Sequence, residues 1–328
     1  MRDWYFKHKP TAILLALFCM FLWGSAFPMI KLGYEALEIT QDDFFGKLFF
    51  AGLRFTLAGV LVYFYHYLLK RKPIPFEKKS LPLMLYLSFF QMSGQYFFFY
   101  IALAYTTGVK SSVLQASSTF MTILLAHFLL KNDKLNQRKT LALLLGFSGI
   151  ICANFTKGFD WHFTFMGEGF MLIAALLSSF GNILVKKTGK SNPFFLASGQ
   201  FFIGGGTLLV IGYLGLDQGL NFTPYSLTLL LYGSFISSTA FVLWYSLLLY
   251  QPVGEISIYR LFIPIFGALL SSLLIPDESF TFGIFAGLLL VILGVLILNR
   301  PQKRLQLPSK DWHTMNDKSY PSNEITFH

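Results

Sequence analysis

The apolar residues of this chain form long, nearly uninterrupted runs that are separated by short polar segments. A bilayer core about 30 Å thick takes roughly 20 residues of α-helix at about 1.5 Å rise per residue. Ten runs reach that length, at residues 11–32, 45–69, 81–104, 108–130, 138–156, 167–186, 193–215, 225–249, 253–275 and 281–299. The pattern predicts an all-α membrane protein with ten transmembrane helices and no separate soluble domain.

The composition supports a lipid environment. Of the 328 residues, 54% are hydrophobic and only 13% are charged, which is more apolar surface than one soluble core buries. The net charge of +10 is spread over short clusters between the apolar runs, so it indicates membrane topology and excludes nucleic acid as an expected partner. The two cysteines lie inside apolar runs and predict neither a disulfide nor a metal site.

The distribution of basic residues predicts the orientation. If the N-terminus is cytoplasmic, the inner segments hold 20 of the 26 Lys and Arg residues. The outer segments carry acidic residues instead, namely Glu35, Glu38, Asp42, Asp43, Asp277 and Glu278. Because cytoplasmic loops are enriched in Lys and Arg, both termini are expected in the cytoplasm.

The two halves of the chain also resemble each other at a shift of 145 or 146 residues. Matching positions include Gly59 with Gly205, Ser93 with Ser238, Tyr100 with Tyr245, Leu103 with Leu248, and Gly149 with Gly294. Five helices are an odd number, so the second half must enter the membrane from the opposite side. Two inverted five-helix repeats predict alternating access, with the substrate bound at mid-membrane between the halves.

The first predicted helix carries Trp23, Gly24, Ser25, Phe27, Pro28 and Lys31, and the second carries Arg54. In their order, spacing and duplication these motifs resemble the EamA family of the drug/metabolite transporter superfamily. Pro264 matches a proline of the ninth helix, whereas Thr119 occupies the equivalent place in the first half. The first-half acid is Asp133 rather than the more usual Glu.

This resemblance covers residues 11 to 299 and implies transport, often export, of amino acids or related metabolites. It implies a first repeat at 1–157, a second, inverted repeat at 158–299 and a flexible cytoplasmic tail at 300–328. A bacterial cell membrane is the expected location, although a eukaryotic organelle stays open.

Polar side chains inside membrane helices usually face a bundle interior or an aqueous cavity. In the fourth helix Ser111, Gln115, Ser118 and Thr122 fall on one face, which predicts a pore-lining stripe. Small hydroxyls can also serve only to let helices pack closely. Gln115 is too large for that, so the pore interpretation is favoured.

Further polar and aromatic side chains lie in other helices of both halves. Gln95 accompanies Gln91 in the third helix, Asn182 lies in the sixth, and Trp244 and Tyr245 lie in the eighth. An aromatic-walled polar cavity would suit an amphipathic solute such as an apolar amino acid. Most single aromatic residues of a membrane protein nevertheless pack or face lipid.

Two arginines lie several residues inside their helices. Arg260 aligns with Gln115 in the repeat, so it is predicted to bind substrate, through a carboxylate or phosphate. Arg54 aligns with Gln200 and is predicted to be structural. A structural or gating role is also expected for Trp23, Pro28, Lys110 and Glu255. No Asp or Glu lies deep in any run, so proton coupling through an embedded carboxylate is not supported.

The sequence contains little that indicates an enzyme. Gly146 to Gly149 matches the GxSG pattern of rhomboid-type proteases, but His66 and His127 lie near helix ends rather than at the depth of Ser148. No motif for a metal, nucleotide or redox cofactor is present, so neither a cofactor nor enzymatic activity is expected.

The sequence therefore predicts a secondary transporter for a small polar or amphipathic metabolite. The expected substrate contacts are Gln95, Ser111, Gln115, Asn182, Trp244, Tyr245 and Arg260. A carrier of drugs, nucleosides or other metabolites is an alternative, and a non-transporting membrane sensor or scaffold is another. The substrate, the direction, the driving force and the oligomeric state stay open, and a monomer is compatible with the sequence.

Overall fold

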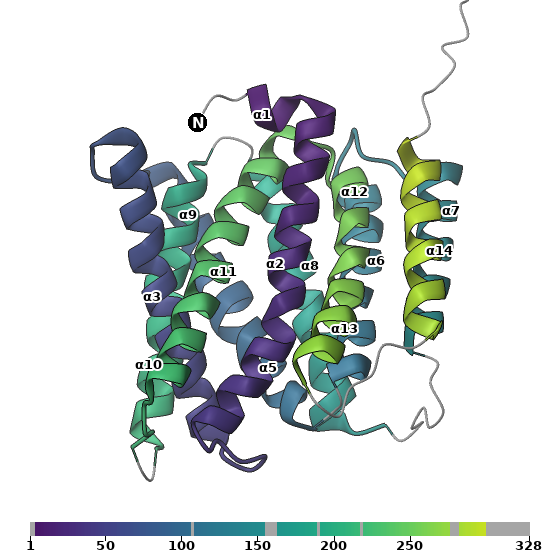
Figure 1. Cartoon of the computed structure of the whole chain (residues 1–328). Coiled ribbons are helices and arrows are strands. Elements are labelled where there is room, and N and C mark those ends of the chain that lie inside the picture. Colours follow the sequence, from purple (N-terminus) through teal and green to yellow (C-terminus); the bar gives the residue numbers. More distant parts are fainter. Residues whose placement is uncertain are drawn as a thin grey trace, which may run out of the picture. The chain divides into compact units, whose positions relative to one another are not determined.

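A computed structural model describes residues 4–105, 108–154, 163–188, 191–216, 219–275 and 282–299. Within these ranges every regular element is a helix (Figure 1). The elements are α1 (Trp4–Lys7), α2 (Lys9–Ala36), α3 (Phe44–Lys70), η1 (Lys78–Ser80), α4 (Leu81–Tyr86), η2 (Leu87–Gly94), α5 (Gln95–Tyr105), α6 (Gly108–Leu129), α7 (Gln137–Asn154), η3 (Phe165–Gly169), α8 (Phe170–Thr188), α9 (Pro193–Gln200), η4 (Phe201–Gly205), α10 (Gly206–Leu214), α11 (Pro224–Tyr250), α12 (Val253–Ile256), η5 (Ser257–Leu261), α13 (Phe262–Leu274) and α14 (Phe282–Asn299).

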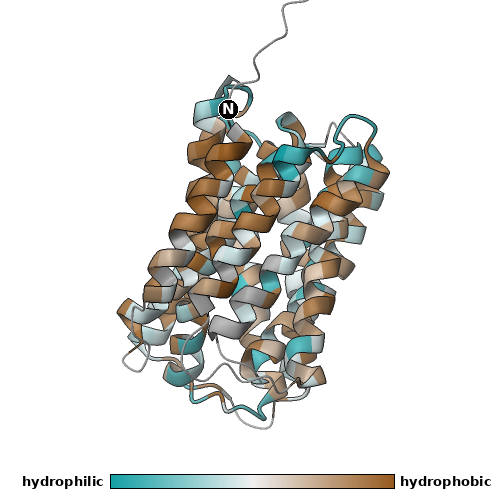
Figure 2. Cartoon of the chain, turned by 90° about the vertical axis from the view of Figure 1, so that its right-hand side faces the viewer, coloured by the Kyte–Doolittle hydropathy of each residue, from teal (hydrophilic) through white to brown (hydrophobic). Residues whose placement is uncertain are grey.

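Within the part of the chain that the structure describes, six helices are long and apolar enough to cross a membrane. They span Lys9–Ala36, Phe44–Lys70, Phe165–Thr188, Pro193–Leu214, Pro224–Tyr250 and Val253–Leu274. Their outward faces are hydrophobic along much of their length, and hydrophilic residues gather towards the two ends of the bundle (Figure 2). This distribution is the one expected of helices whose sides contact lipid and whose ends contact water.

Glycines allow two helix pairs to pack closely. At Gly52 of α3 an added Cβ would meet the backbone of Leu209 in α10, so no side chain fits there. At Gly149 of α7 a Cβ would lie 2.6 Å from the Gly287 carbonyl oxygen of α14. Small residues at these crossings let backbones approach, as is common between membrane helices.

Several of the long helices are interrupted by short segments of different pitch. The segments η2, η3 and η4 are π-helical, and η5 is a 3₁₀ segment between α12 and α13. Each interruption shifts the backbone hydrogen bonds and turns the following side chains to a new direction. Two of these segments, η2 and η5, carry the polar residues Gln91 and Arg260.

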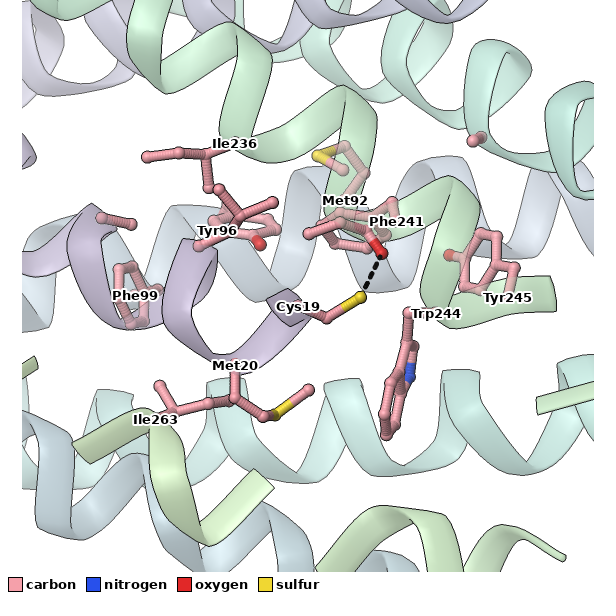
Figure 3. Close-up of a cluster of buried hydrophobic side chains, with 14 of the residues drawn as sticks. Cys19, Met20, Met92, Tyr96, Phe99, Ile236, Phe241, Trp244, Tyr245 and Ile263 are labelled. Carbon is pink, nitrogen blue, oxygen red and sulfur yellow. Dashed lines mark hydrogen bonds between the residues drawn. The ribbon is translucent and has the colours of Figure 1, made fainter. Parts of the chain in front are cut away.

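The centre of the bundle is a cluster of buried hydrophobic side chains that includes many aromatic and sulfur-containing residues (Figure 3). Trp244 and Tyr245 of α11 are among the largest fully buried residues. Cys19 of α2 is also buried, and its thiol donates to the Ala240 carbonyl of α11 over 3.7 Å. α2 and α11 thereby form one central wall.

Candidate functional site

A cavity lies among the central helices. Its walls come from α2, α3, η2, α5, α6, α8, α11, η5 and α13, through Trp23, Ala26, Phe27, Ile30, Arg54, Gln91, Gln95, Tyr96, Phe99, Gln115, Ser178, Asn182, Phe241, Trp244, Arg260 and Ile263. No Asp or Glu is among the lining residues that the structure describes. Small-molecule sites typically have this mixture of aromatic walls with a few polar groups.

Arg260 is held in this wall between two indole rings. Its guanidinium carbon lies 5.9 Å from the centre of the Trp23 ring and 5.8 Å from the centre of the Trp244 ring, which permits cation–π attraction to both. Its Nη2 donates to the Ser178 hydroxyl over 3.2 Å, whereas its buried Nε has no partner. Among the described residues no carboxylate pairs with Arg260.

The indole of Trp244 is fixed by an amide. Its Nε1 donates to Asn182 Oδ1 over 3.0 Å, and the Trp23 ring packs edge-on against it, with ring centres 5.5 Å apart. Asn182 Nδ2 and Trp23 Nε1 are buried without a partner. Both atoms are hydrogen-bond donors, so this part of the wall can receive a molecule with acceptor atoms.

Two glutamines in the wall contribute acceptors. Gln95 of α5 and Gln115 of α6 are both buried, and Oε1 of each has no hydrogen-bond partner. Buried polar groups are normally paired, because an unpaired one costs about 1–3 kcal/mol. Five unpaired polar atoms on residues around one cavity therefore mark it as a place where bound molecules complete the hydrogen bonding.

Arg54 lines the same cavity but is already paired. Its Nε donates to the Gly233 carbonyl of α11 over 3.0 Å, and Nη1 donates to the Tyr100 hydroxyl of α5 over 2.8 Å. Its side chain packs directly over Gly233, where a Cβ would lie 3.1 Å from Arg54 Cδ. Arg54 thus connects three helices and also presents positive charge at the cavity.

The structure places five of the seven expected contact residues in the cavity wall, namely Gln95, Gln115, Asn182, Trp244 and Arg260. The other two are elsewhere. Ser111 is buried in α6 outside this wall. Tyr245 lies behind the wall, with its hydroxyl 2.9 Å from Gln91 Oε1 and 2.7 Å from Gln200 Oε1.

The single hydroxyl proton of Tyr245 cannot be donated to both Gln91 and Gln200 at once. Turning the Gln200 amide would let its Nε2, which has no partner, donate to the Tyr245 hydroxyl, and the hydroxyl would then donate to Gln91. Gln91 Nε2 in turn donates to the Ser178 carbonyl over 3.4 Å. Tyr245 therefore orients Gln91, a lining residue, rather than lining the cavity itself.

The residues expected to have structural or gating roles are scattered. Trp23 lines the cavity beside Arg260, whereas Pro28 is buried inside α2. Glu255 of α12 lies at one end of the bundle, with Oε2 3.9 Å from Lys9 Nζ. Lys110 is in α6, but its side chain lies outside the described residues, as do Asp277 and Glu278.

The residues of the predicted pore-lining stripe in the fourth helix do not all line the cavity. Gln115 lines the cavity, whereas the Ser118 carbonyl accepts a hydrogen bond from Ser179 of α8 over 2.9 Å. The hydroxyls of Ser111 and Thr122 are buried outside this wall without a hydrogen-bond partner. His66 and His127, weighed earlier as protease bases, are bonded near the turns that follow their helices, with Nδ1 3.1 Å from the Lys72 carbonyl and 2.9 Å from Leu135 N.

Several lining residues were not among the expected substrate contacts, namely Phe27, Gln91, Tyr96, Phe99, Ser178 and Phe241. Figure 3 shows Tyr96, Phe99, Phe241 and Trp244 in the central cluster. Helical spacing was the available signal. Trp23 and Phe27, Gln91 and Gln95, and Ser178 and Asn182 are each four residues apart, so each pair shares a face.

Comparison with known proteins agrees with this architecture. The model of the EamA-like transporter family matches the chain twice, over residues 10–155 and 165–300. The uncharacterized transporter YvbV of Bacillus subtilis is 26% identical over 89% of this chain and 92% of its own length. An uncharacterized transporter of Archaeoglobus fulgidus is 27% identical over 90% of this chain and 99% of its own length.

A solved crystal structure has the same fold. It superposes with a TM-score of 0.72 at 15% identity, covering 88% of this chain and 98% of the other. The family model covers most of the sequence, and the relatives named above are transporters, which indicates a transporter rather than an enzyme. The chain belongs to the EamA-like transporter family of the drug/metabolite transporter superfamily and is an integral membrane transport protein.

Proposed function

We propose that this protein is a secondary transporter that binds a small polar or amphipathic, amino acid-like metabolite in the central cavity and exports it by alternating access. The observation that carries the proposal is the origin of the cavity wall. Arg54, Gln95 and Gln115 come from the first family match, and Asn182, Trp244 and Arg260 come from the second. A solute bound between two matched halves is the arrangement that alternating access requires.

In this proposal the chain crosses the membrane ten times, as two inverted sets of five helices. The six long apolar helices are joined by α4–η2–α5, α6, α7 and α14 as the remaining crossings. The repeats are assigned to 1–157 and 158–299, with a tail at 300–328. Support comes from the two family matches and from Gly149 and Gly294, which occupy equivalent places in the contact between α7 and α14.

We assign both termini to the cytoplasm and the protein to a bacterial cell membrane. The basic inner segments favour this orientation, and the named Bacillus subtilis relative favours a bacterial setting. Lys186, one of the inner cations, donates to the Gln251 carbonyl over 2.8 Å, which suits a side chain at a helix end.

The test is flux through purified protein in liposomes. Radiolabelled phenylalanine loaded inside the vesicles should leave faster than from protein-free vesicles, and Gln115→Ala should slow its exit about tenfold, the equivalent of about 1.4 kcal/mol. Ser148→Ala, an exposed position on α7, is the matched control and should keep the wild-type rate. A rate for Gln115→Ala equal to wild type would remove this residue from the site.

The runner-up is a membrane sensor or scaffold that keeps the carrier fold without flux. A bound ligand would then raise the melting temperature of the purified protein by mass action, yet the same ligand would never cross the liposome membrane. Binding without flux for every ligand that stabilises the protein would favour this second function.

A further inference from the structure

The cavity wall carries an unbalanced positive charge. Arg54 and Arg260 both line it, and no acidic residue is among its described lining residues. A charge inside a membrane protein is costly unless a partner compensates it. The wall is therefore suited to a ligand that brings negative charge.

The two arginines differ in what they have left to offer. Arg54 donates to a backbone carbonyl and to a tyrosine hydroxyl, so part of its guanidinium is committed to holding helices. Arg260 has the Ser178 hydroxyl as its hydrogen-bond partner, and its Nε is unpaired. A guanidinium with unused donors pairs best with a planar carboxylate, by two parallel hydrogen bonds.

The surroundings of Arg260 define the rest of such a ligand. Trp23 Nε1 and Asn182 Nδ2 are unpaired donors on residues of the same wall, and a carboxylate accepts hydrogen bonds without donating any. The aromatic lining, including Tyr96, Phe99 and Phe241, offers an apolar surface for the body of the molecule. An ammonium group would meet the unpaired but neutral oxygens of Gln95 and Gln115, and Arg260 repels it.

We propose that the site selects its solute by charge, as a small carboxylic acid with an apolar body, bound as a net monoanion whose carboxylate pairs with Arg260. Arg260 is the residue that determines this specificity. The proposal rests on the proposed transport function, because it names the class of solute that the same cavity accepts. It implies that the amino group of an amino acid contributes little, so removing that group should leave binding unchanged or improve it.

Three probes with one phenyl body test this selection on the wild-type protein. Phenylpropionate is an anion, phenylalanine is a zwitterion and phenethylamine is a cation. Binding to detergent-purified protein is measured by calorimetry and by quenching of tryptophan fluorescence, since Trp23 and Trp244 line the site. We expect phenylpropionate to bind at least as tightly as phenylalanine and about tenfold more tightly than phenethylamine.

Variants test whether the charge of Arg260 causes the preference for an anion. Arg260→Gln should weaken phenylpropionate binding about tenfold or more and leave phenethylamine unchanged or improved, whereas Arg260→Lys should keep part of the preference. Lys70→Gln removes one positive charge at an exposed position outside the cavity and should bind as wild type does. The order phenethylamine above phenylpropionate, no binding of phenylpropionate at millimolar concentration, or an unchanged Arg260→Gln would each overturn the proposal.

Flux measured separately distinguishes the two proposals. Phenylpropionate that binds through Arg260 but does not cross the liposome membrane contradicts transport and leaves the charge selection standing. Phenylalanine that crosses while phenylpropionate neither binds nor competes contradicts the charge selection and leaves transport standing.

Discussion

Two buried polar clusters of this protein use similar side chains and differ in how far they are paired. At one end of the bundle, Asp133 and Lys139 form an ion pair with Oδ1 and Nζ 2.6 Å apart, and both residues are about 95% buried. Asp133 Oδ2 accepts from the Gly254 amide over 2.6 Å, and Lys139 Nζ donates to the Lys134 carbonyl. In the central cavity, Arg260 has no such counter-charge among the described residues.

This difference indicates that the paired cluster stabilises the fold, whereas the cavity residues are suited to bind a ligand. The Asp133 carboxylate joins the turn after α6 to the first residues of α12, so its atoms are used within the fold. The cavity residues leave Trp23 Nε1, Asn182 Nδ2 and Arg260 Nε without partners. Because unpaired buried atoms lower stability, their clustering at one cavity is better explained by a ligand than by folding. Substitutions in the paired cluster should therefore lower stability, whereas substitutions in the cavity should lower transport.

The largest effect is expected at the paired cluster. Asp133→Ala leaves the Lys139 ammonium buried and uncompensated, which should lower the free energy of unfolding by about 3–5 kcal/mol. Thermal unfolding in detergent, followed by tryptophan fluorescence, measures the loss. Asp133→Ala combined with Lys139→Met should be more stable than Asp133→Ala alone, since no charge stays buried. A single variant as stable as wild type would contradict the assignment.

Arg260→Met should give the opposite pattern. Removing an uncompensated buried charge should leave the melting temperature unchanged or raise it, while transport falls about tenfold or more. The two readouts come from one preparation, by thermal unfolding and by liposome flux. A loss of stability comparable to that of Asp133→Ala would make Arg260 a structural residue like Arg54, and the comparison would fail.

Trp244→Phe should produce a smaller effect, because it keeps an aromatic ring beside Arg260 while it removes the donor to Asn182 Oδ1. The loss of one buried hydrogen bond corresponds to about 1 kcal/mol, or roughly a fivefold rise in the Kd or KM for the solute. Trp4→Phe, at a 57% exposed position of α1, is the matched control. Equal constants for both variants would show that the Asn182 contact does not position the indole for binding.

The sequence predicted the residues of the cavity better than their pairing. Arg260, Gln115 and Asn182 were found because polar side chains in apolar runs are rare and costly. Arg54 was expected only to hold helices, and it also lines the cavity. Its partner is the Gly233 carbonyl, 179 residues away, and backbone groups leave no signature in a sequence.

Local backbone changes explain the other differences. The sequence around Arg260 reads as an ordinary apolar helix, whereas η5 is a 3₁₀ segment there, and η2 around Gln91 is π-helical. These shifts arise where long-range packing competes with the regular hydrogen-bond pattern, so periodicity alone does not locate them. Ser111 and Tyr245 lie outside the wall for the related reason that a shared helix face does not determine which neighbour covers it.

The smallest effect is expected at the exposed pair of Lys9 in α2 and Glu255 in α12, where Glu255 directly follows Gly254. The two side chains are 56% and 42% exposed and 3.9 Å apart, so solvent and salt screen their attraction. Glu255→Gln should change the free energy of unfolding by less than about 1 kcal/mol. That change should disappear at high ionic strength, whereas the Asp133→Ala effect should persist, because water and ions do not reach a buried pair. Unfolding curves of both variants at low and high salt make the comparison. A large, salt-resistant loss of stability in Glu255→Gln would mean that α12 depends on both Asp133 and Glu255. The exposure of the two side chains would then no longer explain a difference between them.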